Sequence, residues 1–166
     1  MSLEIESTSS AESKDFIKSF LNTHASGVLI TSDKVGNPYG AVVYFSLDDD
    51  YTLTFATKTE TQKYKNIEEN DQIAFVVYDE KEQMQVQVVG HVEHINDSEE
   101  YKEVLRYMYT TSPKLSMAWL PPVEKLEAGG YIALRLVPQV IKMAIYSRFD
   151  EDREDIYETI LFTQTP

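Results

Sequence analysis

Cysteine is absent from this chain of 166 residues, and that absence excludes several functions. Without a thiol there is no disulfide, no thiolate nucleophile and no cysteine metal site. Long apolar runs are missing too, since none approaches the ~20 residues that span a bilayer. The first residues are polar and acidic, unlike the basic start and apolar core of a signal peptide. We therefore expect a soluble, cytoplasmic protein.

Basic residues are scarce as well: 15 Lys and Arg stand against 28 Asp and Glu, for a formal net charge of −13. Nucleic-acid-binding proteins usually carry a basic stripe, and anionic membranes attract basic surfaces. We expect neither kind of partner. The composition, 42% hydrophobic and 26% charged, is that of a globular protein, and the length fits a single domain over residues 1–166.

Strands dominate the predicted elements, and most follow one another through short turns. Runs of β-branched and aromatic residues predict strands at 28–31, 39–47, 51–57, 72–78, 84–95, 131–137 with 140–146 beyond Pro138, and a short one at 156–163. Helical spacing predicts helices at 10–24, 63–70 and 99–109, the last capped by Asp97. Gly90, inside a long strand, indicates a bulge. This order predicts a mainly antiparallel barrel rather than a parallel α/β sheet.

The stretch from Thr57 to Asn70 is the strongest local candidate for a ligand site. It joins a strand to a helix through Thr59-x-x-Gln62, a capping-box pattern. The first N–H groups of such a helix are unpaired and carry partial positive charge. Hydroxyl and ammonium groups crowd the same turn, from Thr57, Lys58, Thr59, Thr61 and Lys63. In so acidic a chain, this combination predicts a seat for a phosphate.

Short segments follow one another in a specific order along the chain. They are Gly27–Thr31, Gly36–Pro38, Val43–Phe45, Leu53–Thr57, Thr61–Lys63 with Asn66, Ile67 and Asn70, and Gln85–Gly90. In this order and spacing they resemble the FMN-binding split-barrel proteins related to pyridoxamine 5′-phosphate oxidase. The resemblance covers 20–95 well and 131–146 more loosely. It implies a mainly β (α+β) fold, a six-stranded antiparallel split β-barrel with flanking helices.

The resemblance also implies how a flavin would be held. The second strand would lay its backbone along the flavin ring, the third would end near the ribityl phosphate, and the lysine of the next turn would hold the phosphate. The cofactor-binding residues so implied are Val43, Tyr44, Phe45, Ser46, Ala56, Thr57, Lys58, Thr61, Gln62, Lys63 and Gln85. The family is usually dimeric, with the flavin at the subunit interface.

Several positions depart from the family pattern. Ala41 and Gln62 stand where the family often has arginines, which leaves Lys63 as the main phosphate cation with Lys58 nearby. Thr111 stands where a pyridoxamine phosphate oxidase has a substrate-holding arginine. We therefore do not expect that specific reaction.

The expected function is that of an FMN-binding oxidoreductase, which passes electrons through the flavin to an unidentified small molecule. The chemistry would belong to the flavin, so no catalytic residue is assigned. The alternative is a non-catalytic flavin- or haem-binding protein, with His24, His91 or His94 as haem ligands. A deazaflavin is disfavoured because its acidic tail would meet an acidic protein. No metal site is expected, since His91 and His94 are three residues apart and would face opposite sides of a strand.

Overall fold

The structure, a computed structural model, describes residues 3–7, 11–115, 130–146 and 157–164. These residues form one nine-stranded sheet and three helices. The helices are α1 (Ala11–Thr23), α2 (Gln62–Glu69) and α3 (Ser98–Leu115). The strands are β1 (Leu3–Ser7), β2 (Ser26–Ser32), β3 (Pro38–Tyr44), β4 (Ser46–Leu47), β5 (Leu53–Lys58), β6 (Gln72–Asp79), β7 (Met84–His94), β8 (Tyr131–Ile145) and β9 (Tyr157–Gln164).

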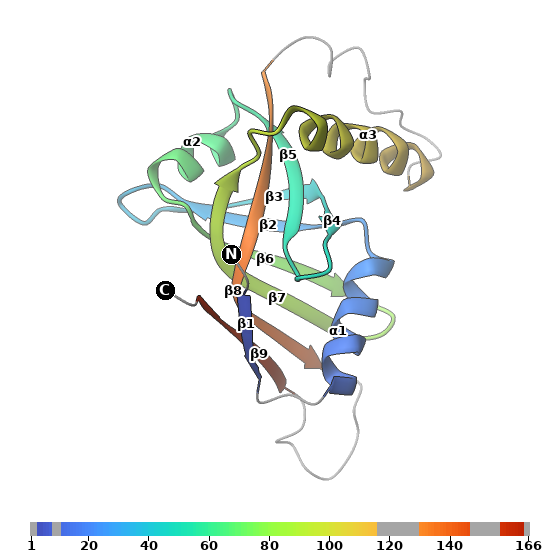
Figure 1. The fold of residues 1–166 in the computed structure, drawn as a ribbon. Helices are drawn as coiled ribbons and strands as arrows, with labels where there is room; N and C mark the ends of the chain where they lie inside the picture. The colour runs from blue at the N-terminus through green and yellow to red at the C-terminus, as the bar shows by residue number, and fades with distance from the viewer. Residues whose placement is uncertain (1–2, 8–10, 116–129, 147–156, 165–166) are drawn as a thin grey trace.

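The strands curl into an antiparallel split barrel, which confirms the predicted fold class (Figure 1). Their main order is β1-β9-β8-β7-β6-β2-β3, while β5 pairs with β4 and β8. Strand β8 is central because it pairs with β5 over its first half and with β9 over its second half. Helices α2 and α3 lie toward the end of the barrel where β8 begins (Figure 1). No described helix is both long and apolar enough to cross a membrane.

The strand count differs from the prediction, with nine strands instead of six. Strand β1 was not expected because its sequence is polar and acidic, yet it pairs with β9 along its whole length. The strand predicted at 39–47 divides at Phe45 into β3 and β4, which pair with different neighbours. Partner choice, which local composition does not encode, accounts for both differences.

Pro138 does not interrupt β8, so the predicted break there is wrong. The predicted bulge at Gly90 is confirmed: the register shifts between Val89 and Gly90, and Gln139 is the extra residue of β8. Gly90 faces Pro138, and a Cβ at Gly90 would lie only 2.0 Å from the Val137 carbonyl oxygen. A proline without an N–H and a glycine without a side chain together let the strand pass through the bulge.

The core lies inside the curl of the sheet and under α1. Alternate residues of β6 and β7 point inward; Phe75 and Val86, for example, are each 0% exposed. Helix α1 closes this side with its apolar stripe of Ile17, Phe20 and Leu21. At the start of α3, the Oδ1 atom of Asp97 accepts from the N–H groups of Glu99 and Glu100 at 3.0 and 2.9 Å, which confirms the predicted cap.

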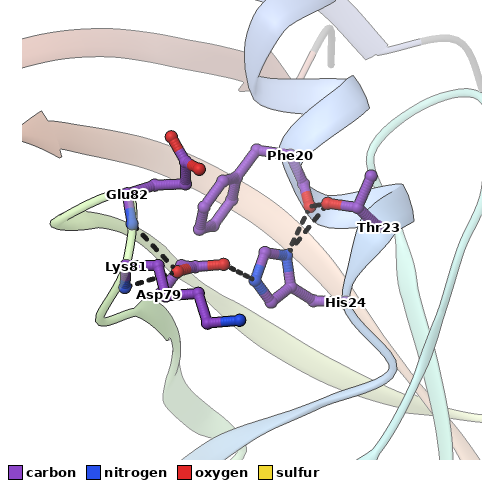
Figure 2. A network of polar contacts seen from close by, with 6 residues as sticks. All are labelled: Phe20, Thr23, His24, Asp79, Lys81 and Glu82. Atoms are coloured by element: carbon purple, nitrogen blue, oxygen red, sulfur yellow. Dashed lines mark hydrogen bonds and ion pairs between the residues drawn. The ribbon is translucent and has the colours of Figure 1, made fainter.

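The end of α1 is tied to the turn after β6 by one histidine (Figure 2). The Nδ1 atom of His24 lies 2.7 Å from the Phe20 carbonyl oxygen, and its Nε2 lies 3.2 Å from Oδ2 of Asp79. The Oδ1 atom of Asp79 accepts from the N–H groups of Lys81 and Glu82 at 2.8 and 3.1 Å. Both histidine partners can only accept, so both contacts are hydrogen bonds when the ring carries two protons.

Replacing Asp79 with asparagine should therefore lower stability in a pH-dependent way. The N–H of Glu82 is the main cause that holds the pKa of Asp79 below its ordinary value, helped by Lys81 and His24 against desolvation. A lowered folded-state pKa stabilises above the unfolded value, roughly 3.9, and the contribution is lost as pH falls through the folded value. We expect Asp79→Asn to lower Tm at about pH 6, and the deficit to shrink toward about pH 2.5.

Thermal melts followed by circular dichroism at both pH values would measure this difference. Glu80→Gln, at an exposed neighbouring carboxylate, is the control and should leave Tm unchanged. An equal loss of Tm by Asp79→Asn at both pH values would contradict the charge-based account.

Candidate cofactor-binding site

Helix α2 begins at Gln62, two residues later than a cap at Thr59 predicts. The N-cap is Thr61, whose Oγ1 accepts from the N–H of Tyr64 at 3.4 Å, so the predicted capping box is wrong. Thr59 is held elsewhere, because its N–H donates to the Gly130 carbonyl at 2.9 Å. The Thr61 hydroxyl also donates to the Lys58 carbonyl at 2.7 Å, which fixes the turn between β5 and α2.

A cavity of about 270 Å³ lies beside this turn. Its walls come from β3, from the end of β5, from the first turn of α2 and from the start of β8. The lining residues are Val42, Val43, Tyr44, Ala56, Thr57, Lys58, Thr61, Lys63 and Tyr131. Lys58 and Tyr131 are opposite each other in the pairing of β5 with β8, which brings the last wall into place. Most of the residues predicted to bind the cofactor therefore meet at one cavity.

Lys63 is the cation of this cavity that has no counter-ion. It has no ion-pair partner among the described residues, and burial lowers the pKa of its ammonium group. Lys58 differs: its Nζ lies 3.6 Å from a Glu60 carboxylate oxygen and 5.3 Å from the centroid of the Tyr131 ring. An anion that approaches a half-buried ammonium without an ion-pair partner gains a favourable charge interaction and favours its protonated form. The cavity is thus suited to an anionic group.

Hydroxyl and amide groups surround the same position. The hydroxyls of Thr57 and Thr61 share a hydrogen bond of 3.1 Å, and Thr57 is buried. The first turn of α2 leaves the N–H groups of Gln62 and Lys63 without an acceptor inside the helix. These donors lie beside Lys63, which adds the partial positive charge of the helix N-terminus to its own.

Other predicted residues lie near the cavity without lining it. Phe45 is fully buried, with its ring centroid 5.1 Å from that of Phe75, so only its backbone could meet a ligand. Ser46 is in β4 opposite Thr54. Gln62 is an exposed residue that does not line the cavity, and its Nε2 atom donates to Oδ1 of the buried Asn66 at 2.8 Å.

Gln85 lies elsewhere in the chain. It faces Tyr78 of β6 and Ala144 of β8, near the opposite end of β8 from Tyr131. Its side chain is half-buried, on the sheet face that points away from the core. Within one chain the fold does not bring Gln85 to the cavity.

Sequence reasoning missed two lining residues, Val42 and Tyr131. Val42 immediately precedes the predicted residue Val43, and this position next to it was the available signal in the sequence. In the structure its apolar side chain is exposed. Tyr131 reaches the cavity only through the pairing of β5 with β8, which no local pattern reveals.

The histidines do not form a ligand set. Beyond the contacts of His24, Nε2 of His91 lies 3.4 Å from Glu93, and Nε2 of His94 lies 3.0 Å from Glu68. None of the three lines the cavity. The described part of the chain contains no group of three or more histidine or acidic residues placed to hold a metal ion.

Comparison with known proteins assigns the chain to a family. The sequence model of the pyridoxamine 5′-phosphate oxidase family matches residues 13–135, so the chain belongs to that family. This confirms the resemblance seen in the sequence segments. No curated protein sequence matches the chain.

Solved structures share the fold at low sequence identity. A protein from Agrobacterium tumefaciens has a TM-score of 0.63 and 19% identity, over 90% of this chain and 61% of the other. A heme-binding protein from Mycobacterium smegmatis has a TM-score of 0.56 and 14% identity, over 76% and 51%. An FMN-binding, pyridoxamine 5′-phosphate oxidase-related protein from Nostoc punctiforme has a TM-score of 0.58 and 15% identity, over 95% and 100%. The chain thus spans only about half to three-fifths of the first two.

The position of the helix cap can be tested by paired alanine substitutions. Thr61→Ala removes the hydroxyl that caps α2 and fixes the turn, so we expect a loss of about 1–2 kcal/mol in the free energy of unfolding. Thr59→Ala changes an exposed side chain and should cost less than about 0.5 kcal/mol. Urea denaturation would measure both. A greater loss for Thr59→Ala would restore the capping box centred on Thr59.

Proposed function

We propose that the chain binds flavin mononucleotide in this cavity and acts as a flavin-dependent oxidoreductase on an unidentified small molecule. The observation that carries the proposal is Lys63, a half-buried cation without a counter-ion among the described residues. It stands beside the N-terminus of a helix, and this combination of an ammonium group and free N–H donors suits a phosphate.

Each wall of the cavity has a role in this proposal. Lys63 and the first N–H groups of α2 would hold the phosphate, because the Thr61 hydroxyl is already engaged with Tyr64 and Lys58. The buried Thr57 hydroxyl would position the ribityl end. The backbone of Val43 and Tyr44 would lie along the ring system.

Bound flavin would supply the electron-transfer chemistry, while the chain's residues orient it and exclude water. We assign no acid–base catalyst. The proposal does not extend to oxidation of pyridoxamine phosphate, because Thr111 replaces the arginine that the family uses for that substrate. We further propose that residues 1–166 act as one domain in the cytoplasm.

A second copy of the chain would complete the site. About 270 Å³ is less than the roughly 300–1,000 Å³ of typical ligand pockets. The outward sheet face beside the cavity carries two rows of cross-strand neighbours, which we call the outer face; the second row has no polar side chain, and the first has none on β3, β2 and β6. These rows are Val42, Val28, Val76, Gln87, Lys142 and Thr159, and Gly40, Ile30, Ala74, Val89, Val140 and Leu161.

The outer face has the character of a subunit interface. Lys142 is the one charged residue in its two rows, and Val42 is 71% exposed. Its exposed apolar side chains are Val28, Val42 and Leu161, and apolar side chains gathered on one exposed face often mark a contact surface. Since Val42 belongs to both the outer face and the cavity, a partner docked there would add a wall to the flavin site. We propose a homodimer of this kind, in which Gln85 of one chain approaches the flavin of the other.

The haem alternative has weaker support. One structural relative is a heme-binding protein. In this chain, however, each histidine lies within ion-pair distance of a carboxylate and outside the cavity. Those contacts would have to break before a histidine could ligate iron.

Titration with FMN, followed by quenching of flavin fluorescence, tests the site. We expect micromolar affinity for the wild type and a loss of about tenfold or more for Lys63→Met, because a charge-assisted contact is lost. Lys65→Met is the matched control, on the exposed side of α2, and should bind FMN like the wild type. Absence of binding, or equal loss in both variants, would reject the phosphate site.

Anaerobic reduction of the bound flavin by NADPH or NADH would separate an oxidoreductase from a passive binder.

The dimer can be tested by placing a charge on the outer face. Val28→Glu puts a carboxylate between Val42 and Val76 and should shift the protein from dimer to monomer in light-scattering chromatography. FMN affinity should fall with it. Val35→Glu, at a 74% exposed turn position, is the control and should leave the dimer intact. A dimer that survives Val28→Glu would place the interface elsewhere.

A further inference from the structure

A second, larger cavity of about 450 Å³ shares no lining residue with the proposed flavin site. It lies where the turn between β4 and β5 meets β7, β8 and the start of α3. Its lining residues are Asp48, Asp49, Asp50, Thr52, Glu93, Glu100, Arg135 and Val137. Its size is within the range of small-molecule pockets, roughly 300–1,000 Å³.

The fold assembles these residues from distant parts of the chain. Arg135 of β8 lies opposite Thr54 of β5 on one side and Glu93 of β7 on the other. Glu100 comes from the first turn of α3 and forms an ion pair with Arg135. The β4–β5 turn adds its three aspartates beside them.

The cavity carries an excess of negative charge after its internal ion pairs are counted. Glu100 neutralises Arg135, and Nζ of Lys18 lies 2.7 Å from Asp49. Among the described residues, Asp48 and Asp50 form no ion pair, and the ion-pair contact of Glu93 is with His91, at 3.4 Å. Desolvation is the main cause that raises the pKa of Asp48, with Asp50 and Glu100 adding repulsion and Arg135 opposing them.

An independent observation is the hydroxyl of Thr52. The residue is only 5% exposed, and its side chain lines the cavity while that of the next residue, Leu53, lies in the core. Both main-chain groups of Thr52 are hydrogen-bonded within the turn. Its N–H donates to Asp50 Oδ1 at 3.0 Å, and its carbonyl oxygen accepts from the Asp48 N–H at 2.9 Å. In the described structure, however, its hydroxyl has no hydrogen-bond partner. Its Oγ1 atom is not shut off from solvent although the residue is buried, so the hydroxyl is open to the cavity and available to a ligand there.

We propose that this cavity binds an aliphatic polyamine through separated ammonium groups. The unneutralised carboxylates lie on two sides, on the β4–β5 turn and on β7, which suits a ligand with charges spaced along a chain. Val137 and the aliphatic stem of Arg135 offer apolar contact for methylene groups. The Thr52 hydroxyl accepts from one ammonium group.

A single metal ion fits the arrangement less well. The described residues contain no cluster of three or more carboxylates or histidines placed to hold an ion. A monoamine would reach only one of the two acidic sides. The spacing of charge thus distinguishes a polyamine from either.

Isothermal titration with spermidine tests the proposal on the full chain. We expect saturable binding at one site per chain, with butylamine at least about tenfold weaker because it makes one charge contact. The double variant Asp48→Asn with Glu93→Gln should bind spermidine at least about tenfold more weakly. Thr52→Val should weaken it severalfold, whereas Thr52→Ser should retain it.

A control with the same change in net charge separates this site from general attraction to an acidic protein. Glu12→Gln with Glu80→Gln removes two exposed carboxylates outside the cavity and should change the affinity less than twofold. Lys63→Met, which tests the flavin site, should leave spermidine binding unchanged. Absence of saturable binding, or an equal loss in both double variants, would overturn the proposal. Unchanged binding by Thr52→Val would overturn the role of that hydroxyl.

Discussion

Strand β8 can serve both halves of the barrel because Gly90 has no side chain. The carbonyl of Val137 passes where a Cβ of residue 90 would lie, and Gln139 bulges out of register beside it. Before this point β8 pairs with β5, and beyond it with β9, while β7 stays its neighbour throughout. Both cavities depend on this continuous strand. Tyr131 lines the proposed flavin cavity, and Arg135 and Val137 line the acidic one.

Helix α3 links the two cavities in the same way. Its Glu100 reaches Arg135 in the acidic cavity, and the hydroxyl of the next residue, Tyr101, donates to the Tyr131 carbonyl at 3.1 Å. Tyr101 also packs with Val104 over Ala56 and Ala133. A shift of α3 along β8 would therefore change both cavities at once, although they share no residue.

Local sequence patterns predicted much of the fold and the central residues of the candidate site. Strands, three helices, the Asp97 cap, the Gly90 bulge and the position of Lys63 follow from residue types within a few positions of one another. What they could not supply was pairing over long separations. The register of β5 with β8 brings Tyr131 to the proposed flavin cavity, and Thr59 bonds to Gly130 while Thr61 caps the helix. The residues of the acidic cavity come from separate segments between positions 48 and 137, so no local sequence pattern predicted that they would meet.

The departures from the family pattern acquire a physical meaning in this structure. With glutamine at position 62, the side chain there bonds to Asn66, and the proposed phosphate seat is left with Lys63, which has no counter-ion among the described residues. Lys58 also lines the seat but is shared with Glu60 and the Tyr131 ring, so an incoming phosphate must compete for it. In a chain of net charge −13, long-range repulsion of an anion adds to this competition. Under the proposed function, binding of FMN should then depend on short-range donors at the helix start and on the apolar face of the proposed partner subunit more than on charge.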